Sequence, residues 1–91
     1  MKVIWTQPAR NDFIQTLDFI RSKNPVAARQ VAEVIENACR RIGDFPGIGK
    51  PGKLEETREF SIFSIPYNII YRVHRNTVEI LGLLHHKQQW P

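Results

Sequence analysis

Helical spacing of apolar residues is the clearest pattern in the chain. Between residues 24 and 43 the apolar side chains recur at steps of three and four residues, at Ala28, Val31, Ile35, Ala38 and Ile42. This spacing predicts an amphipathic helix. Asn24 is a good N-cap and Pro25 suits the first turn, while Gly43 suits the C′ position. We therefore expect the helix to begin after Asn24 and to end at Gly43.

A weaker stripe of the same kind precedes this helix. It consists of Ala9, Phe13, Leu17 and Ile20. The stripe predicts a helix that Thr6 caps, with Pro8 in its first turn, and that ends near Lys23. The connection to the second helix is so short that the two helices should form an antiparallel hairpin.

Extended segments lie on both sides of the hairpin. Bulky and β-branched residues alternate over Met1–Thr6, which predicts a short strand. Residues 44–53 are rich in Gly and Pro and predict a loop. Three further strands are expected at Arg58–Ser64, Tyr67–His74 and Val78–Leu84, with a tight turn at Arg75-Asn76 before the last. The order β-α-α-β-β-β predicts an α+β fold, with the helical hairpin packed on an antiparallel sheet.

The third strand of this sheet should have one buried and one open face. Side chains alternate across a strand, which separates Tyr67, Ile69, Tyr71 and Val73 from Asn68, Ile70, Arg72 and His74. The first set is expected to meet the helices. The second set would then place Arg72 and His74 on an open sheet face, where a ligand or another chain could reach them.

Composition limits the classes of function. The 91 residues suffice for one domain, 1–91, with a net charge of +4 that fits an acidic partner. Cys39 is the only cysteine, so no internal disulfide or Cys/His metal framework is possible, and a reducing cytoplasm is expected. Apolar runs are too short for a signal peptide or a membrane span. We expect no metal, no cofactor and no membrane partner.

The order of several short motifs resembles the RelE/ParE superfamily of toxins from bacterial type II toxin–antitoxin modules. These motifs are Trp5-Thr6, Asp12-Phe13, Asn24-Pro25, Phe45-Pro46, Thr57-Arg58-Glu59-Phe60, Pro66–Val73, Val78–Leu81, Leu84-His85 and Trp90-Pro91. The resemblance covers essentially the whole chain. It implies the β-α-α-β-β-β fold, which agrees with the periodicity, and a small antitoxin as partner, ParD-like or similar.

The superfamily has two branches with different targets. The RelE-like branch cleaves mRNA on the ribosome, whereas the ParE-like branch poisons DNA gyrase without being a nuclease. The positions that match the catalytic arginines of RelE hold Phe63 and Gln88 here. Arg58-Glu59, Pro66-Tyr67 and the terminal Trp90-Pro91 look like the ParE-like branch, so gyrase inhibition by binding is favoured. A metal-independent, ribosome-dependent mRNA endonuclease is the alternative.

Five residues are candidates for contacts with a partner: Arg58, Arg72, His85, His86 and Trp90. Under the endonuclease alternative, His86 would act as acid or base with support from Arg72, Lys87 or Arg58. The helical hairpin or a sheet edge is expected to receive an apolar, acidic antitoxin segment.

Structural roles for the same residues remain open. Arg58 could instead hold a loop carbonyl, Arg72 could pair with Glu79 across the strands, and Trp90 could fold back on the core. His85 and His86 could simply form a polar strand end. Cys39 is expected to be a small buried residue rather than a nucleophile.

Overall fold

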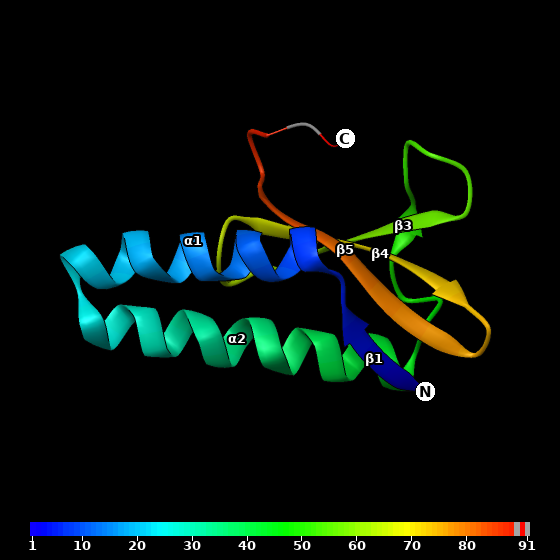
Figure 1. Ribbon diagram of the computed structural model, residues 1–91, viewed down its shortest axis with the longest axis horizontal. Coiled ribbons are helices and arrows are strands. Elements are labelled where there is room, and N and C mark those ends of the chain that lie inside the picture. The colour runs from blue at the N-terminus through cyan, green and yellow to red at the C-terminus, as the bar shows by residue number, and fades with distance from the viewer. Residues whose placement is uncertain (89, 91) are drawn as a thin grey trace.

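Two helices pack on one face of a twisted sheet (Figure 1). The computed structural model describes residues 1–88 and 90. The elements are β1 (Lys2–Trp5), α1 (Gln7–Lys23), α2 (Pro25–Asp44), β2 (Lys50–Pro51), β3 (Thr57–Ser61), β4 (Tyr67–His74) and β5 (Thr77–His85). They follow the expected order, with β2 as one additional strand. The α+β class is confirmed. No helix within the described residues is long and apolar enough to cross a membrane.

The caps of the hairpin are those that the sequence predicts. The Thr6 hydroxyl accepts from Ala9 N–H at 3.4 Å and the Asn24 side chain accepts from Ala27 N–H at 3.1 Å. The prediction for the end of α2 is wrong, because the helix continues past Gly43 and Phe45 is its C-cap. Gly43 is buried within α2, and a Cβ at this position would lie only 2.9 Å from Val3 Cγ2. The glycine thus permits β1 to approach α2 closely.

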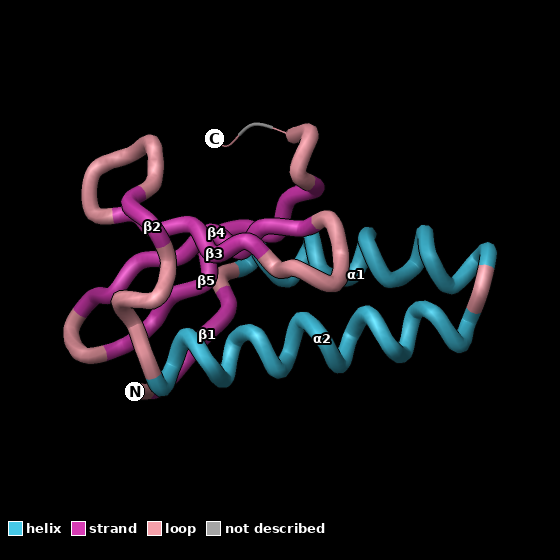
Figure 2. Tube along the Cα trace, turned by 180° about the vertical axis from the view of Figure 1, so that it is seen from behind, coloured by secondary structure: helices cyan, strands magenta, loops and turns pink. Residues whose placement is uncertain are grey.

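The sheet has the strand order β1-β5-β4-β3-β2. β3, β4 and β5 form the expected antiparallel meander, and the turn at Arg75-Asn76 has positive φ at both residues, as a type I′ turn requires. β1 joins the edge of β5 in parallel, so the sheet is mixed. β3 is shorter than predicted, and β2 is a two-residue edge strand inside the predicted loop (Figure 2).

The core lies between α2 and the helix-facing side of β4 and β5. Ile69 and Tyr71 of β4 are fully buried there, as expected, but Val73 is 41% exposed because it lies at the outer end of the strand. Ile70 is 1% exposed although it points to the opposite face. Its cross-strand partner is Gly82, beyond a register shift at Ile70/Tyr71.

α1 closes the edge of β5 where β1 ends. Thr6 donates both its N–H (3.0 Å) and its hydroxyl (2.8 Å) to the carbonyl of Ile80. Asp12 Oδ2 of α1 accepts from Leu83 N–H at 3.1 Å. Thr6 and Asp12, at the start of α1, therefore satisfy backbone groups of β5 that would otherwise lie unpaired at this edge.

Candidate partner-binding site

Arg58 holds the glycine-rich loop in place. Its Nη1 donates to the carbonyl of Gly49 at 2.6 Å and lies 3.5 Å from that of Gly47. Beside it, the buried Tyr71 hydroxyl donates to Pro46 O at 2.7 Å and accepts from Gly49 N–H at 2.9 Å. Burial raises the pKa of Tyr71 above its ordinary value, while the Gly49 N–H and the Arg58 charge oppose this shift. The guanidinium of Arg58 is thus hydrogen-bonded to the loop and has a structural role there.

Arg72 forms a cross-strand ion pair on the open sheet face. Its Nε lies 2.6 Å from Glu79 Oε1, and the two residues are direct partners in the β4–β5 ladder. The side chain of Arg72 remains 44% exposed, whereas that of Glu79 is 19% exposed. The guanidinium is therefore oriented by Glu79 and is still accessible to an acidic partner.

His85 organises a tight turn after β5. Its Nδ1 accepts from Lys87 N–H at 3.2 Å, its carbonyl accepts from Gln88 N–H at 2.9 Å, and its own N–H donates to Gln88 Oε1 at 2.8 Å. The ring also packs edge-on against Tyr67 at 5.4 Å between centroids. These contacts give His85 a structural role in the turn.

His86 and Lys87 are exposed in the same turn. The N–H of His86 donates to Pro66 O at 2.8 Å. Its side chain lines a small hollow of about 160 Å³ with Ser61, Ile62 and Phe63. His86 and Lys87 thus lie at the end of the sheet where the loop from β3 to β4 begins.

Trp90 folds back on β5. A Cβ built on Gly82 would lie 3.0 Å from Trp90 Nε1 and 3.2 Å from its Cδ1. The indole therefore occupies the space that the missing side chain of Gly82 leaves, on the face where Ile70 is buried. Trp90 itself is partly exposed. Pro91, which belongs to the same motif, lies outside the described residues.

The candidate residues do not converge on one catalytic centre. Arg72 pairs with Glu79, whereas His85 pairs with Tyr67 at the other end of the ladder. The five residue steps along β4 from Tyr67 to Arg72 separate these ends by about 17 Å. Arg58 pairs with Tyr71, and its guanidinium lies in the loop. Only Lys87 is close to His86 among the cations named for the endonuclease alternative.

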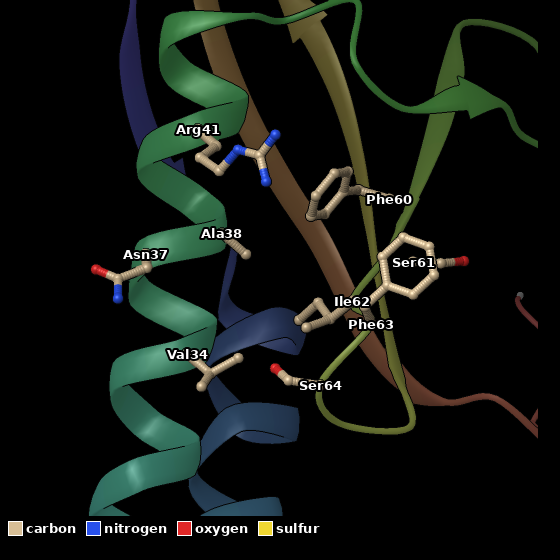
Figure 3. Close-up of a pocket in the computed structure, with 9 residues that line it drawn as sticks. All are labelled: Val34, Asn37, Ala38, Arg41, Phe60, Ser61, Ile62, Phe63 and Ser64. Atoms are coloured by element: carbon tan, nitrogen blue, oxygen red, sulfur yellow. The ribbon is translucent and has the colours of Figure 1, made fainter.

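The sequence did not reveal a groove between α2 and β3, which we name the α2–β3 groove (Figure 3). Its volume is about 310 Å³ and its lining residues are Val34, Asn37, Ala38, Arg41, Phe60, Ser61, Ile62, Phe63 and Ser64. The Arg41 guanidinium lies over the Phe60 ring, 5.9 Å from its centroid. Phe63 is fully exposed. The sequence does contain one signal for the groove, because Val34, Ala38 and Arg41 are spaced as on one face of a helix, beside the core stripe of α2.

One strand edge opens into this groove. β2 pairs only with Arg58 and Glu59 of β3 within the described residues. The Thr57 carbonyl points to the β2 side, since it accepts from Gly52 N–H at 2.8 Å. Alternation along the strand then directs the backbone groups of Ser61 to the same side, beyond the end of β2. The groove therefore combines apolar side chains, a cation and free backbone groups.

Cys39 lies buried in α2. Burial raises its pKa to about 12, the Glu36 charge adds to the shift, and the Arg40 charge opposes it. A thiol with so high a pKa is almost entirely protonated at neutral pH and is a poor nucleophile.

Known proteins share both the sequence pattern and the fold. The chain is 37% identical over 90 residues to a Sinorhizobium fredii (strain NBRC 101917 / NGR234) protein described as "Putative toxin Y4kP". The aligned region covers 99% of this chain and 93% of the relative. A structure of the chromosomal ParDE system from P. aeruginosa has a TM-score of 0.85 at 20% identity, covering 93% of this chain and 95% of that chain.

The isolated E. coli RelE toxin is a more distant neighbour in structure. It has a TM-score of 0.65 at 12% identity and covers 97% of this chain and 86% of that chain. The model of the ParE toxin family of type II toxin–antitoxin systems, parDE, matches residues 3–90. Because that match spans nearly all of the sequence, the chain belongs to the ParE toxin family.

Proposed function

We propose that this toxin inhibits DNA gyrase by binding in the cytoplasm, and that a ParD-like antitoxin neutralises it. The observation that best supports binding over RNA cleavage is the separation of about 17 Å along β4 between Arg72 and the end of the sheet that carries His86. Membership in the ParE family points in the same direction.

RNA cleavage without a metal demands several groups around one phosphate. A base must take the 2′-hydroxyl proton, an acid must protonate the leaving oxygen, and cations must stabilise the phosphorane. His86 is exposed and could serve as acid or base, but Arg58 is bound to the loop and Arg72 to Glu79. Phe63, exposed beside His86, carries no charge. The geometry thus favours a docking toxin.

The open sheet face and the turn from His85 to Trp90 form the surface proposed to contact gyrase. Arg72 is an accessible cation of this face, and Glu79, at 2.6 Å, orients it. Trp90 offers a partly exposed aromatic ring, a residue type that often anchors interfaces. In the mechanism we propose, contacts of this surface with gyrase trap a cleaved DNA complex.

A supercoiling assay with purified toxin tests this function. We expect inhibition at stoichiometric toxin, accumulation of cleaved DNA, and substantial loss of both with Arg72→Ala. Arg21→Ala is the matched control, because Arg21 also forms an exposed ion pair, with Asp18 at 2.8 Å, but lies on the hairpin. Full gyrase activity at large toxin excess would refute the proposal.

The endonuclease alternative is tested with a reporter transcript and purified ribosomes. If the chain were an endonuclease, ribosome-dependent cleavage would occur and His86→Ala would abolish it, while His74→Ala, which alters the exposed histidine at the far end of β4, would not. Because we propose a toxin that acts by binding, we expect an intact transcript with the wild type, with His86→Ala and with His74→Ala.

The α2–β3 groove is the place that we propose for the antitoxin. Its apolar floor and exposed Phe63 suit apolar side chains, and the Ser61 edge suits an added strand. Arg41 belongs to no ion pair in the described part of the chain, and the chain as a whole is basic. An apolar segment with acidic residues would therefore complement the groove in shape and charge.

Binding of the product of the adjacent reading frame tests this placement. Phe63→Ser should weaken the complex at least about tenfold, since the loss of one buried aromatic contact exceeds 1.4 kcal/mol. Phe45→Ser is the control, because Phe45 is also an exposed phenylalanine but follows α2 outside the groove. Equal affinities of the two variants would contradict the placement, and no complex at all would count against an antitoxin from that frame.

A further inference from the structure

The outer edge of β1 is a free strand edge beside a second groove. β1 forms a ladder with β5 and, within the described residues, with no other strand. A groove of about 470 Å³ lies at this edge, lined by Ile4, Trp5, Arg10, Phe13 and Glu36. Free edges of this kind are templates for pairing with another strand.

The outward backbone groups of this edge belong to Val3 and Trp5. Thr6 N–H donates to Ile80 O at 3.0 Å, so Thr6 faces β5. Because successive residues of a strand point to opposite sides, Lys2 and Ile4 also direct their backbone groups to β5. Val3 and Trp5 then point outward, which agrees with the exposed hydrogen bond that Arg10 Nη1 donates to Trp5 O at 3.3 Å. This bond uses one lone pair of the Trp5 carbonyl and leaves the second for a strand partner.

We propose that β1 pairs antiparallel with β1 of a second copy of this chain, across a two-fold axis at Ile4. In this register Val3 lies opposite Trp5 of the second copy, and the two residues can exchange both of their outward N–H···O bonds. Symmetry repeats the pair on the other side of the axis. The two sheets join into one continuous sheet, and both free β1 edges are removed.

The side chains of β1 are complementary to themselves in this register. Val3 and Trp5 lie on the helix-facing side, where a β-branched and an aromatic residue make a favourable cross-strand pair. Ile4, 37% exposed in the single chain, meets Ile4 of the second copy at the axis. Lys2 lies opposite Thr6 of the second copy, so no like charges face one another across the ladder.

Charges in the groove also favour a second copy as the occupant. Arg10 and Glu36 both line the groove, and neither belongs to an ion pair in the part of the chain that the structure describes. A two-fold arrangement brings the groove of one copy against that of the other. Each copy then supplies one cation and one anion, and the interface is neutral as a whole.

Sedimentation of the purified toxin alone tests whether it dimerises, independently of gyrase and antitoxin. We expect a species of twice the chain mass at micromolar to submillimolar concentrations. Ile4→Lys places two like charges opposite one another and should weaken the dimer at least about tenfold. The matched control is Val73→Lys, because Val73 is a similarly exposed apolar strand residue on β4 and should leave the dimer unchanged.

Cross-linking tests the register of the pairing. Opposite residues of a non-hydrogen-bonded antiparallel pair have Cα atoms about 4.5 Å apart, which a disulfide can span. Ile4→Cys should therefore give a covalent dimer under mild oxidation, whereas Val73→Cys should not, and the native Cys39 is buried. A monomer at every concentration, a dimer that is indifferent to Ile4→Lys, or a dimer that Ile4→Cys does not cross-link would overturn the proposal.

Discussion

The Tyr71 hydroxyl donates a hydrogen bond to the carbonyl of Pro46 at 2.7 Å, across 25 residues of chain. The same oxygen accepts from Gly49 N–H at 2.9 Å, so one side chain of β4 fixes two points of the glycine-rich loop. Gly49 permits this approach, since a Cβ there would lie 2.8 Å from the hydroxyl. The loop after α2 is thereby attached to the centre of the sheet, next to the strand that borders the α2–β3 groove.

Tyr71→Phe should destabilise the fold by about 1–3 kcal/mol, because it leaves the Pro46 carbonyl and the Gly49 N–H without their partner. Urea unfolding of both proteins measures the difference. Tyr67→Phe is the control, since no hydrogen bond of the Tyr67 hydroxyl is found within the described residues, and it should change stability much less. Equal effects of the two substitutions would show that the loop does not depend on this hydroxyl.

Stability at alkaline pH should depend on Cys39. Burial raises the pKa of its thiol to about 12, above the ordinary value of 9.0 that the unfolded chain should show. Between these values the unfolded chain releases the thiol proton and the folded chain retains it. The contribution of the thiol to the free energy of unfolding is therefore complete below pH 9 and is lost as the pH rises toward 12. Unfolding curves from pH 8 to about 11 should show a smaller loss for Cys39→Ala than for the wild type. Parallel losses would contradict the shift.

Most of the fold follows from local patterns in the sequence. The caps Thr6 and Asn24, the α2 stripe and the turn at Arg75-Asn76 each carry their own signal, and all four are found in the structure. The end of α2 has no such signal. Gly43 resembles a helix terminator, but its role is to admit β1, a contact with residues 40 positions away along the chain.

The candidate site was less predictable because its parts meet only in three dimensions. The pair of Arg72 with Glu79 could be anticipated from adjacent strands joined by a short turn. The placement of Trp90 depends on the absence of a side chain at Gly82, and the burial of Ile70 on the open sheet face accompanies it. The spacing of apolar residues does not indicate such contacts. The α2–β3 groove is a similar case, because it combines two segments about 25 residues apart in the sequence.

Gly43→Ala should destabilise the protein although alanine favours helices. The exchange would gain about 1 kcal/mol in a free helix interior, but the new Cβ would lie 2.9 Å from Val3 Cγ2 and 3.0 Å from the Met1 carbonyl. Overpacking of this kind costs about 1–3 kcal/mol, so a small net loss is expected. Gly47→Ala is the control, because nothing lies within 4 Å of its added Cβ. Stabilisation by Gly43→Ala in thermal unfolding would refute the steric role.

Gly82→Ala should displace Trp90 from the open sheet face with little effect on the rest of the fold. The added Cβ would lie 3.0 Å from the indole nitrogen and 3.6 Å from Asp12 Oδ2. Trp90 is expected to move because the close contact is with its side chain and not with backbone. The indole should become more accessible to water, which tryptophan fluorescence reports as a red shift and stronger quenching by acrylamide. Gly47→Ala should leave the spectrum unchanged. If Trp90 contributes to the gyrase contact, Gly82→Ala should also weaken inhibition while thermal stability stays within about 1 kcal/mol of the wild type. Unchanged fluorescence in Gly82→Ala would show that Trp90 does not lie against this glycine in solution.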